Sequence, residues 1–298
     1  MSIKYLFNPT KLRSAENSRR IPLSENGIVL KGENGCTAIL IHGLTGTPNE
    51  MRYVANLLNK KGYSVICPRL ANHGEPLAIL QQTTWQEFYE SVRKVFTTVR
   101  QEKPNEKIFV AGLCMGALLG LLLADEFGSQ VLGVSCLSVT LFYDGWGVPW
   151  YRILLPLFLR TPLKHFSYYK EDPPYGIKDE AIRERVHRYY TKATFDDLEQ
   201  VGDHGYPYVP ATVLYQNELL IKYVVKRLPF IEVPVQLIQA KEDDTTSVKN
   251  SEFVYNRIKS KTKELILLED SYHIITVDRQ RDKVAEKIDA FFSSVAAL

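Results

Sequence analysis

Short apolar segments alternate with amphipathic helical segments along most of this chain, and this alternation limits the fold more than any other sequence feature. The expected strands are 37–41, 63–67, 107–113, 131–137, 235–240 and 264–268. The expected helices are 47–61, 84–99, 115–126, 249–258 and a last one that starts near 279. Strands that alternate with helices predict an α/β fold, in which a mostly parallel sheet is covered by helices on both faces.

Two of the helix starts have the sequence pattern of a capping box. Thr47-Pro48-Asn49-Glu50 combines the pattern with a proline at the first helical position, and Thr84 and Glu87 repeat the spacing. In such a box the two side chains bind each other's backbone N–H groups. We therefore expect Glu50 to bind the backbone of Thr47.

The alternation stops between about Phe142 and Phe230, where aromatic residues, prolines and charges accumulate without a clear strand. This stretch interrupts the sheet pattern, so we expect an insertion over the carboxyl ends of the strands, where such folds bind ligands. The predicted organisation is a core of residues 1–140 and 231–298 with a cap of residues 141–230.

The insertion contains a strongly apolar segment, 146–159. It is interpreted as core of the cap, as the wall of an acyl pocket, or as a membrane-surface contact. A soluble monomer rarely exposes so much apolar surface, so we expect most of it to be enclosed. Trp146, Trp150 and Phe158 are the candidate substrate-binding residues.

Composition excludes several classes of protein. The 298 residues carry a formal charge of +3 and are 45% hydrophobic, which argues against a nucleic-acid partner and against disorder. No apolar run approaches the ~18 residues of a membrane-spanning helix, and residues 1–20 lack the apolar region of a signal peptide. Four widely spaced cysteines predict no metal site and a reduced, cytoplasmic protein. The oligomeric state stays open.

The strongest motif, Gly112-Leu113-Cys114-Met115-Gly116, lies where an expected strand meets an expected helix. It matches the nucleophile elbow G-x-S-x-G with cysteine in the central position. The glycines permit a sharp turn, and the positive end of the helix stabilises a thiolate and a developing oxyanion. The motif predicts Cys114 as a nucleophile; the alternative is an inert cysteine between packing glycines.

A second motif, His42-Gly43-Leu44-Thr45-Gly46, follows the expected strand 37–41 directly. Such a turn presents backbone N–H groups to a reacting centre, one after the His-Gly pair and one after the nucleophile. Leu44 and Met115 occupy these two places, so we expect them to form an oxyanion hole. The alternative is an ordinary glycine-rich connection.

A histidine and an acidic cluster follow the last two expected strands. His273 lies in the loop before the last helix, and Glu242, Asp243 and Asp244 follow strand 235–240. A cysteine nucleophile needs a base, and the base needs a carboxylate that fixes its tautomer. We expect His273 to be the base and prefer Asp243 as the acid, with Asp244 as the next candidate.

Together these stretches resemble the α/β-hydrolases of the small bacterial carboxylesterase and monoacylglycerol-lipase-like type. The matching segments are 40–46, 62–74, 110–116, 240–243 and 271–278, within regions that span roughly two thirds of the chain. The resemblance implies a Cys114–His273–Asp243 triad, oxyanion donors Leu44 and Met115, a small-molecule acyl substrate, and no metal or organic cofactor. The chain departs from the family pattern at Cys114, where serine is usual, and at Ala117, where glycine is common.

The cysteine has a chemical consequence. A cysteine acyl-enzyme is a thioester. Its formation from an oxygen ester is unfavourable in free energy, whereas its formation from a thioester substrate has a free-energy change near zero. The chain is therefore expected to hydrolyse acyl esters or thioesters. An acyltransferase of the same fold and a non-catalytic ligand-binding member remain the alternatives.

The remaining candidates have structural interpretations. His73 is expected to support a loop. The other histidines of the insertion are expected at the surface or in packing, and the other cysteines are expected to be buried: His165, His187, His204, Cys36, Cys67 and Cys136.

Overall fold

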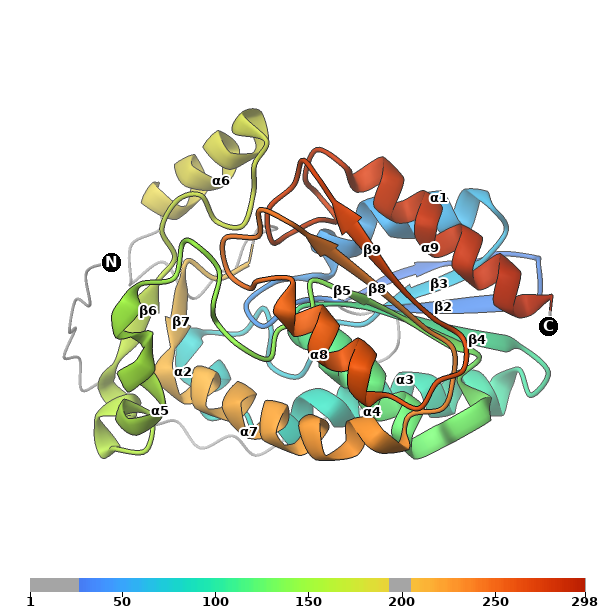
Figure 1. Cartoon of the computed structure of the whole chain (residues 1–298), viewed down its shortest axis with the longest axis horizontal. Helices are drawn as coiled ribbons and strands as arrows, with labels where there is room; N and C mark the ends of the chain where they lie inside the picture. Colours follow the sequence, from blue (N-terminus) through green and yellow to red (C-terminus); the bar gives the residue numbers. More distant parts are fainter. Residues whose placement is uncertain (1–26, 193–204, 298) are drawn as a thin grey trace.

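The computed structural model describes residues 27–192 and 205–297, so residues 1–20 and His204, both discussed above, lie outside them. A seven-stranded sheet in the order β1-β3-β2-β4-β5-β8-β9 forms the centre of the molecule (Figure 1). Its strands are β1 Ile28–Leu30, β2 Cys36–Ile41, β3 Ser64–Cys67, β4 Lys107–Leu113, β5 Gly133–Leu137, β8 Val235–Ala240 and β9 Lys263–Leu268. Only β1 is antiparallel to its neighbour in this sheet, so the expected parallel sheet is confirmed and gains one short edge strand.

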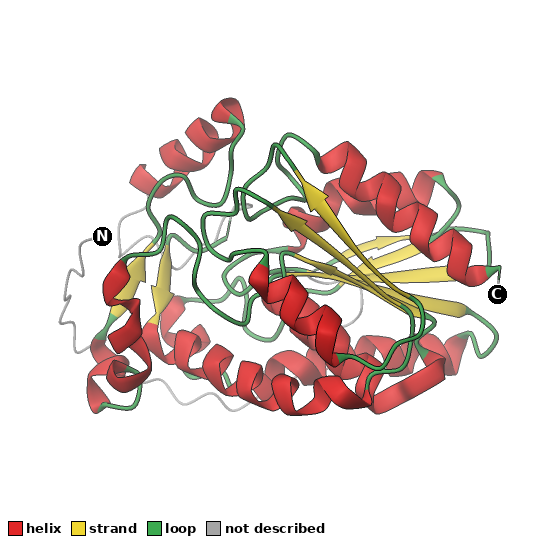
Figure 2. Ribbon diagram, viewed as in Figure 1, coloured by secondary structure: helices red, strands yellow, loops and turns green. Residues whose placement is uncertain are grey.

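Helices cover both faces of the sheet (Figure 2). The α-helices are α1 Arg52–Lys60, α2 Leu77–Leu80, α3 Trp85–Glu102, α4 Met115–Phe127, α5 Leu155–Phe158, α6 Glu180–Lys192, α7 Ala211–Arg227, α8 Lys249–Arg257 and α9 Arg281–Ala296. Short 3-10 helices are η1 Pro48–Met51, η2 Gly128–Gln130, η3 Trp150–Leu154, η4 Pro162–Phe166 and η6 Leu228–Phe230. α1 and α9 pack on one face, α3, α4 and α8 pack on the other, and α7 lies against α3 and α4.

The alternation of side chains along β2 shows why helices pack on both faces of the sheet. Ile39 and Ile41 belong to the apolar cluster under α3 and α4, whereas Ala38 and Leu40 belong to the cluster under α1 and α9. All four are fully buried. Successive residues of a strand point to opposite faces, so a strand that is apolar throughout requires a helix layer on each side.

One of the two expected capping boxes forms. At α3, Glu87 N donates to Thr84 Oγ1 and Thr84 N donates to Glu87 Oε2 at 2.8 Å, as predicted. At η1, Thr47 caps the helix by accepting from Asn49 N. The prediction for Glu50 is wrong, because its carboxylate accepts from Gly43 N at 2.9 Å instead.

The chain between β5 and β8 crosses the carboxyl-end edge of the sheet. It contains α5, α6, α7 and the ribbon of β6 Tyr168–Lys170 and β7 Tyr208–Pro210, none of which the sequence predicted. Backbone hydrogen bonds tie it to the loops of that edge: Tyr206 N donates to Thr45 O, Gly145 N to Thr245 O, and Ile274 N to Gly176 O. The insertion therefore meets the loops that carry the candidate site.

The apolar segment of the insertion is less enclosed than expected. Trp150 is 82% exposed and Trp146 is 60% exposed, whereas Phe158 is half-buried. The expectation that most of this segment is covered is wrong, because its short helices run along the surface instead of forming a core of their own. No helix among the described residues is long and apolar enough to cross a membrane.

Candidate active site

Cys114 occupies the turn between β4 and α4. Its backbone adopts φ 56° and ψ −115°, in the region that residues with a side chain rarely enter. The turn closes tightly, because a Cβ on Gly112 would lie 2.1 Å from Gly116 O and one on Gly116 would lie 2.3 Å from Ile41 O. Cys114 N donates to Leu137 O at 2.9 Å. The two glycines and the strained turn present the thiol at the sheet edge, with the N-terminus of α4 behind it.

His273 and Asp243 meet in the loops that follow β9 and β8. His273 Nδ1 lies 2.9 Å from Asp243 Oδ2 and 3.1 Å from Asp243 Oδ1, and both side chains are buried. The same carboxylate accepts from the backbone N–H groups of Thr245 and Thr246, each at 2.8 Å, and from Gln239 Nε2 at 2.7 Å. These donors hold the carboxylate in one orientation, which in turn fixes the imidazole.

The neighbouring acidic residues serve other contacts. Asp244 Oδ2 accepts from Gly176 N at 3.1 Å, and burial raises the pKa of this carboxyl. Glu242 forms an ion pair with Lys178 at 2.5 Å. Of the three candidates for the acid, the structure brings only Asp243 into hydrogen-bond contact with His273.

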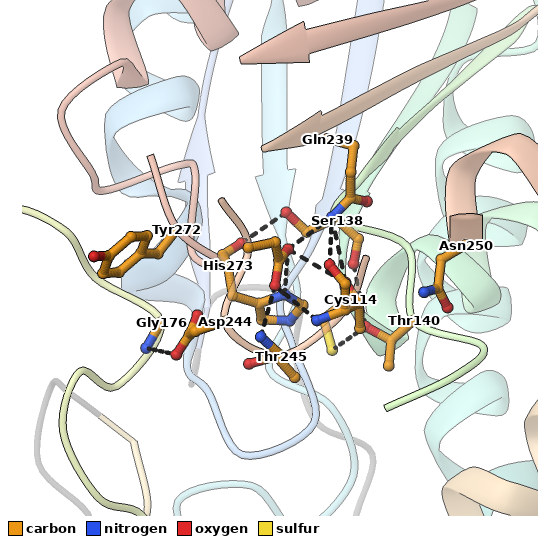
Figure 3. A network of polar contacts seen from close by, with 12 residues as sticks. Cys114, Ser138, Thr140, Gly176, Gln239, Asp244, Thr245, Asn250, Tyr272 and His273 are labelled. Carbon is orange, nitrogen blue, oxygen red and sulfur yellow. Dashed lines mark hydrogen bonds and ion pairs between the residues drawn. The ribbon is translucent and has the colours of Figure 1, made fainter. Parts of the chain in front are cut away.

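The charge around His273 favours the protonated ring. Burial disfavours the imidazolium, but Asp243 on one side and Cys114 on the other raise the pKa of His273 well above its ordinary value. Nε2 of His273 is buried and has no hydrogen-bond partner among the described residues. Figure 3 shows His273 beside Cys114. This arrangement suits a thiolate paired with an imidazolium.

Leu44 lies in the loop after β2 and Met115 begins α4, and a Cβ on Gly43, next to Leu44, would lie 3.6 Å from Cys114 Cβ. The role of Leu44 and Met115 as oxyanion donors stays a prediction. Met115 is the first residue of α4, so its N–H has no acceptor within the helix. His73 supports the loop that carries Leu44, because His73 Nε2 lies within hydrogen-bond distance of Leu44 O, at 2.8 Å. Leu70 N donates to His42 Nε2 at 3.2 Å, so both histidines have the supporting contacts expected of structural residues.

Thr140 is a contact of the thiol that the motifs did not identify. Its Oγ1 lies 3.1 Å from Cys114 Sγ and 3.2 Å from Ser138 O, so its single proton can be donated to either atom (Figure 3). Asn250 Oδ1 accepts from Leu141 N and thereby holds the loop that carries Thr140. The sequence contains one signal for it, since Thr140 follows a strand that ends at the same sheet edge as β4.

Removal of the Thr140 hydroxyl should make the thiol less reactive. When Cys114 is a thiolate, the Thr140 hydroxyl can turn its proton from Ser138 O to the sulfur and stabilise this nucleophilic form. We expect Thr140→Val to slow alkylation of the native protein by iodoacetamide at pH 7 by about fivefold, as the loss of one hydrogen bond worth about 1 kcal/mol predicts. Thr140→Ser is the matched control and should react like wild type. A Thr140→Val variant that is labelled at the wild-type rate would exclude this role.

Glu50 is a residue near the site whose contact the capping-box pattern assigned wrongly. Its carboxylate accepts from Gly43 N, and a Cβ on Gly46 would lie 2.1 Å from Glu50 Oε2. The carboxyl group is thus packed against the loop that carries Leu44. Burial raises the pKa of Glu50 to about 7, with the Gly43 hydrogen bond and His273 acting in the opposite direction.

Glu50 should make stability depend on pH. Its pKa is higher in the folded chain than in the unfolded one, so its contribution to stability is complete below pH ~4.5 and is lost as the pH rises through about 7. The free energy of unfolding of wild type relative to Glu50→Gln should fall by up to about 3 kcal/mol between pH 4.5 and 8. Urea titrations across this range measure it, with Glu33→Gln, at an exposed carboxyl, as the control. Parallel curves for wild type and Glu50→Gln would contradict the assignment.

The candidate acyl-binding residues lie apart from the thiol's hydrogen-bond network. Trp146 Nε1 donates to Glu242 O at 2.8 Å, and its ring packs 5.4 Å from that of Tyr272, so it braces the loop before Asp243. Contact of Trp146, Trp150 and Phe158 with an acyl chain stays a prediction. Among residues 27–192 and 205–297, no group of three or more His, Cys, Asp or Glu side chains could hold a metal ion.

The other expected residues are placed as follows. His165 and His187 are exposed, and His187 Nδ1 lies 2.8 Å from the hydroxyl of Tyr175. Cys36, Cys67 and Cys136 are buried as predicted, and burial raises the pKa of each thiol.

Comparison with known proteins gives a consistent result. A family model described as "Serine aminopeptidase, S33" matches residues 33–280. The thermostable monoacylglycerol lipase of Bacillus sp. (strain H-257) is 26% identical over 282 residues, which cover 94% of this chain and 99% of the relative. The carboxylesterase of Bacillus subtilis (strain 168) is 22% identical over 257 residues, 86% of this chain and 92% of the relative. A solved structure reported for LipS and LipT, two metagenome-derived lipolytic enzymes, has a TM-score of 0.74 and 24% identity, and covers 90% of this chain and 97% of that one. The matched family model and the similar solved structure confirm the expected α/β-hydrolase fold.

Proposed function

We propose that this chain, which belongs to the family described as "Serine aminopeptidase, S33", is a hydrolase of acyl esters or thioesters. In this proposal it acts through a covalent intermediate on Cys114. One observation carries the proposal: a thiol on a strained turn lies beside a histidine whose other nitrogen is held by a buried carboxylate. The relatives named as a monoacylglycerol lipase and a carboxylesterase support an ester as the bond that is cleaved.

The proposed reaction has two halves. In the first, the Cys114 thiolate attacks the acyl carbonyl carbon, the oxyanion accepts hydrogen bonds from the N–H groups of Leu44 and Met115, and the His273 imidazolium protonates the leaving group. In the second, His273 takes a proton from water, the hydroxide attacks the thioester, and Cys114 leaves as a thiolate. Asp243 stabilises the imidazolium in both halves.

The cysteine also favours a second candidate, transfer of the acyl group to an acceptor other than water. Acylation of Cys114 by a thioester substrate has a free-energy change near zero, because one thioester is exchanged for another. The intermediate then retains enough free energy to acylate an alcohol, an amine or a thiol. Hydrolysis and transfer share the first half of the reaction and differ only in what attacks the acyl-cysteine.

Intact-protein mass spectrometry distinguishes the candidates. Wild type incubated with acyl thioesters and nitrophenyl esters should gain the mass of one acyl group, more readily from the thioester, and Cys114→Ala should gain none. An added alcohol or thiol that appears in the product identifies transfer, and free acid alone identifies hydrolysis. Adducts that persist in Cys114→Ala, or a ligand that binds without acylation or turnover, would contradict the proposal.

A further inference from the structure

The short helices η3, α5 and η4 form an exposed apolar surface, here called the 150–166 surface. Trp150 is 82% exposed, Ile153 76% and Leu157 68%, and three further large apolar residues of the same stretch are also exposed: Leu154, Leu163 and Phe166. In Figure 1 this surface lies at the end of the molecule formed by α5, β6 and β7. Contiguous apolar exposure on this scale is typical of an interaction site and rare elsewhere on soluble domains.

The same surface is basic. Residues 150–166 contain Arg152, Arg160 and Lys164 but no aspartate or glutamate, although the chain as a whole has 34 acidic residues. Arg152 and Arg160 are exposed. Lys164 is half-buried, and its Nζ lies 3.8 Å above the ring of Tyr215.

The combination of exposed apolar side chains and interspersed cations fits one occupant best. A second copy of this chain seated on the same surface in a symmetric dimer would bring the cations of both copies together, which is unfavourable. A small acyl molecule would require an enclosed pocket, and these side chains are open. The interface of an anionic bilayer accepts Trp, Leu and Ile among its acyl chains and attracts Arg and Lys to its headgroups.

We propose that the 150–166 surface binds the interface of an anionic lipid bilayer, as a peripheral contact that does not span the membrane. The aromatic and aliphatic side chains enter the headgroup boundary, and Arg160 and Lys164 contact the phosphates. This binding does not depend on the proposed triad, since among the described residues no hydrogen bond or ion pair joins these side chains to Cys114, His273 or Asp243.

Vesicle flotation with the full chain tests the proposal. Wild type should float with vesicles of phosphatidylcholine and phosphatidylglycerol, and should bind pure phosphatidylcholine vesicles at least tenfold more weakly, because each basic residue near an anionic surface strengthens binding about fivefold. Higher salt should weaken binding. Ile153→Ser/Leu157→Ser and Arg160→Glu/Lys164→Glu should each lose at least tenfold in partition coefficient.

Matched controls keep the test specific. Val29→Ser/Phe230→Ser changes exposed apolar residues elsewhere, and Lys60→Glu/Lys226→Glu changes exposed lysines elsewhere, so both should float like wild type. Circular dichroism and thermal midpoints establish that every variant folds. Absence of binding to anionic vesicles, or equal losses in test and control variants, would overturn the proposal. A concentration-dependent dimer that only the 150–166 variants lose would assign the surface to a second copy instead.

Discussion

Cys114→Ala should abolish turnover while the protein stays folded. The alanine keeps the Cβ and the strained backbone of the turn, so the thermal midpoint should remain close to that of wild type. Loss of the nucleophile removes the covalent route entirely, and the rate with an acyl thioester or a nitrophenyl ester should fall by at least about ten-thousand-fold.

Cys114→Ser tests whether the reaction requires sulfur itself. Serine retains the geometry but must lose a proton from a far less acidic hydroxyl, so we expect weak esterase activity at most. If Cys114→Ala keeps more than about a tenth of the wild-type rate, far above what the loss of a triad nucleophile leaves, the reaction does not pass through this thiol.

Asp243→Asn should be the second most damaging change. The Asp243 carboxylate accepts hydrogen bonds from His273, Gln239, Thr245 and Thr246, and an amide can satisfy these donors only in part. The imidazole then loses its correct tautomer and its charge partner, which costs about ten-thousand-fold in kcat in a related triad.

Asp244→Asn is the matched control, one residue along the same loop. Its amide oxygen can still accept from Gly176 N, and His273 keeps Asp243. We expect kcat/KM to stay within about tenfold of wild type. Equal losses in the two variants, or a greater loss in Asp244→Asn, would remove Asp243 from its proposed role.

The catalytic edge of the sheet could be predicted from sequence because its signals are local. β4 and β8 have the predicted bounds, and α4 differs by one residue, since each is a mostly apolar run. The sequence favours Asp243 as the partner of His273 but does not exclude its neighbours, because three adjacent acidic residues follow the same strand. The conformation of the loop determines which of the three carboxylates reaches the imidazole.

Other features depend on contacts distant in sequence and could not be predicted in the same way. Glu50 has the spacing of a capping box, yet the N–H of Gly43 competes with that of Thr47 and binds the carboxylate. α7 has many β-branched and aromatic residues, and its helical character comes from packing on α4. The exposure of Trp150 contradicts a general tendency to bury aromatic side chains.

The order of the strands also has a consequence for synthesis of the chain. Cys114 follows β4, in the middle of the sheet, whereas His273 follows β9 at its edge, about 160 residues later. At ~5–20 residues per second, roughly 10–30 s of translation separate the two side chains. The thiol thus emerges from the ribosome well before the histidine proposed to activate it, and β4 can pair with β2 and β5 during this interval. The proposed acyl transfer can therefore begin only after residue 273 has been made.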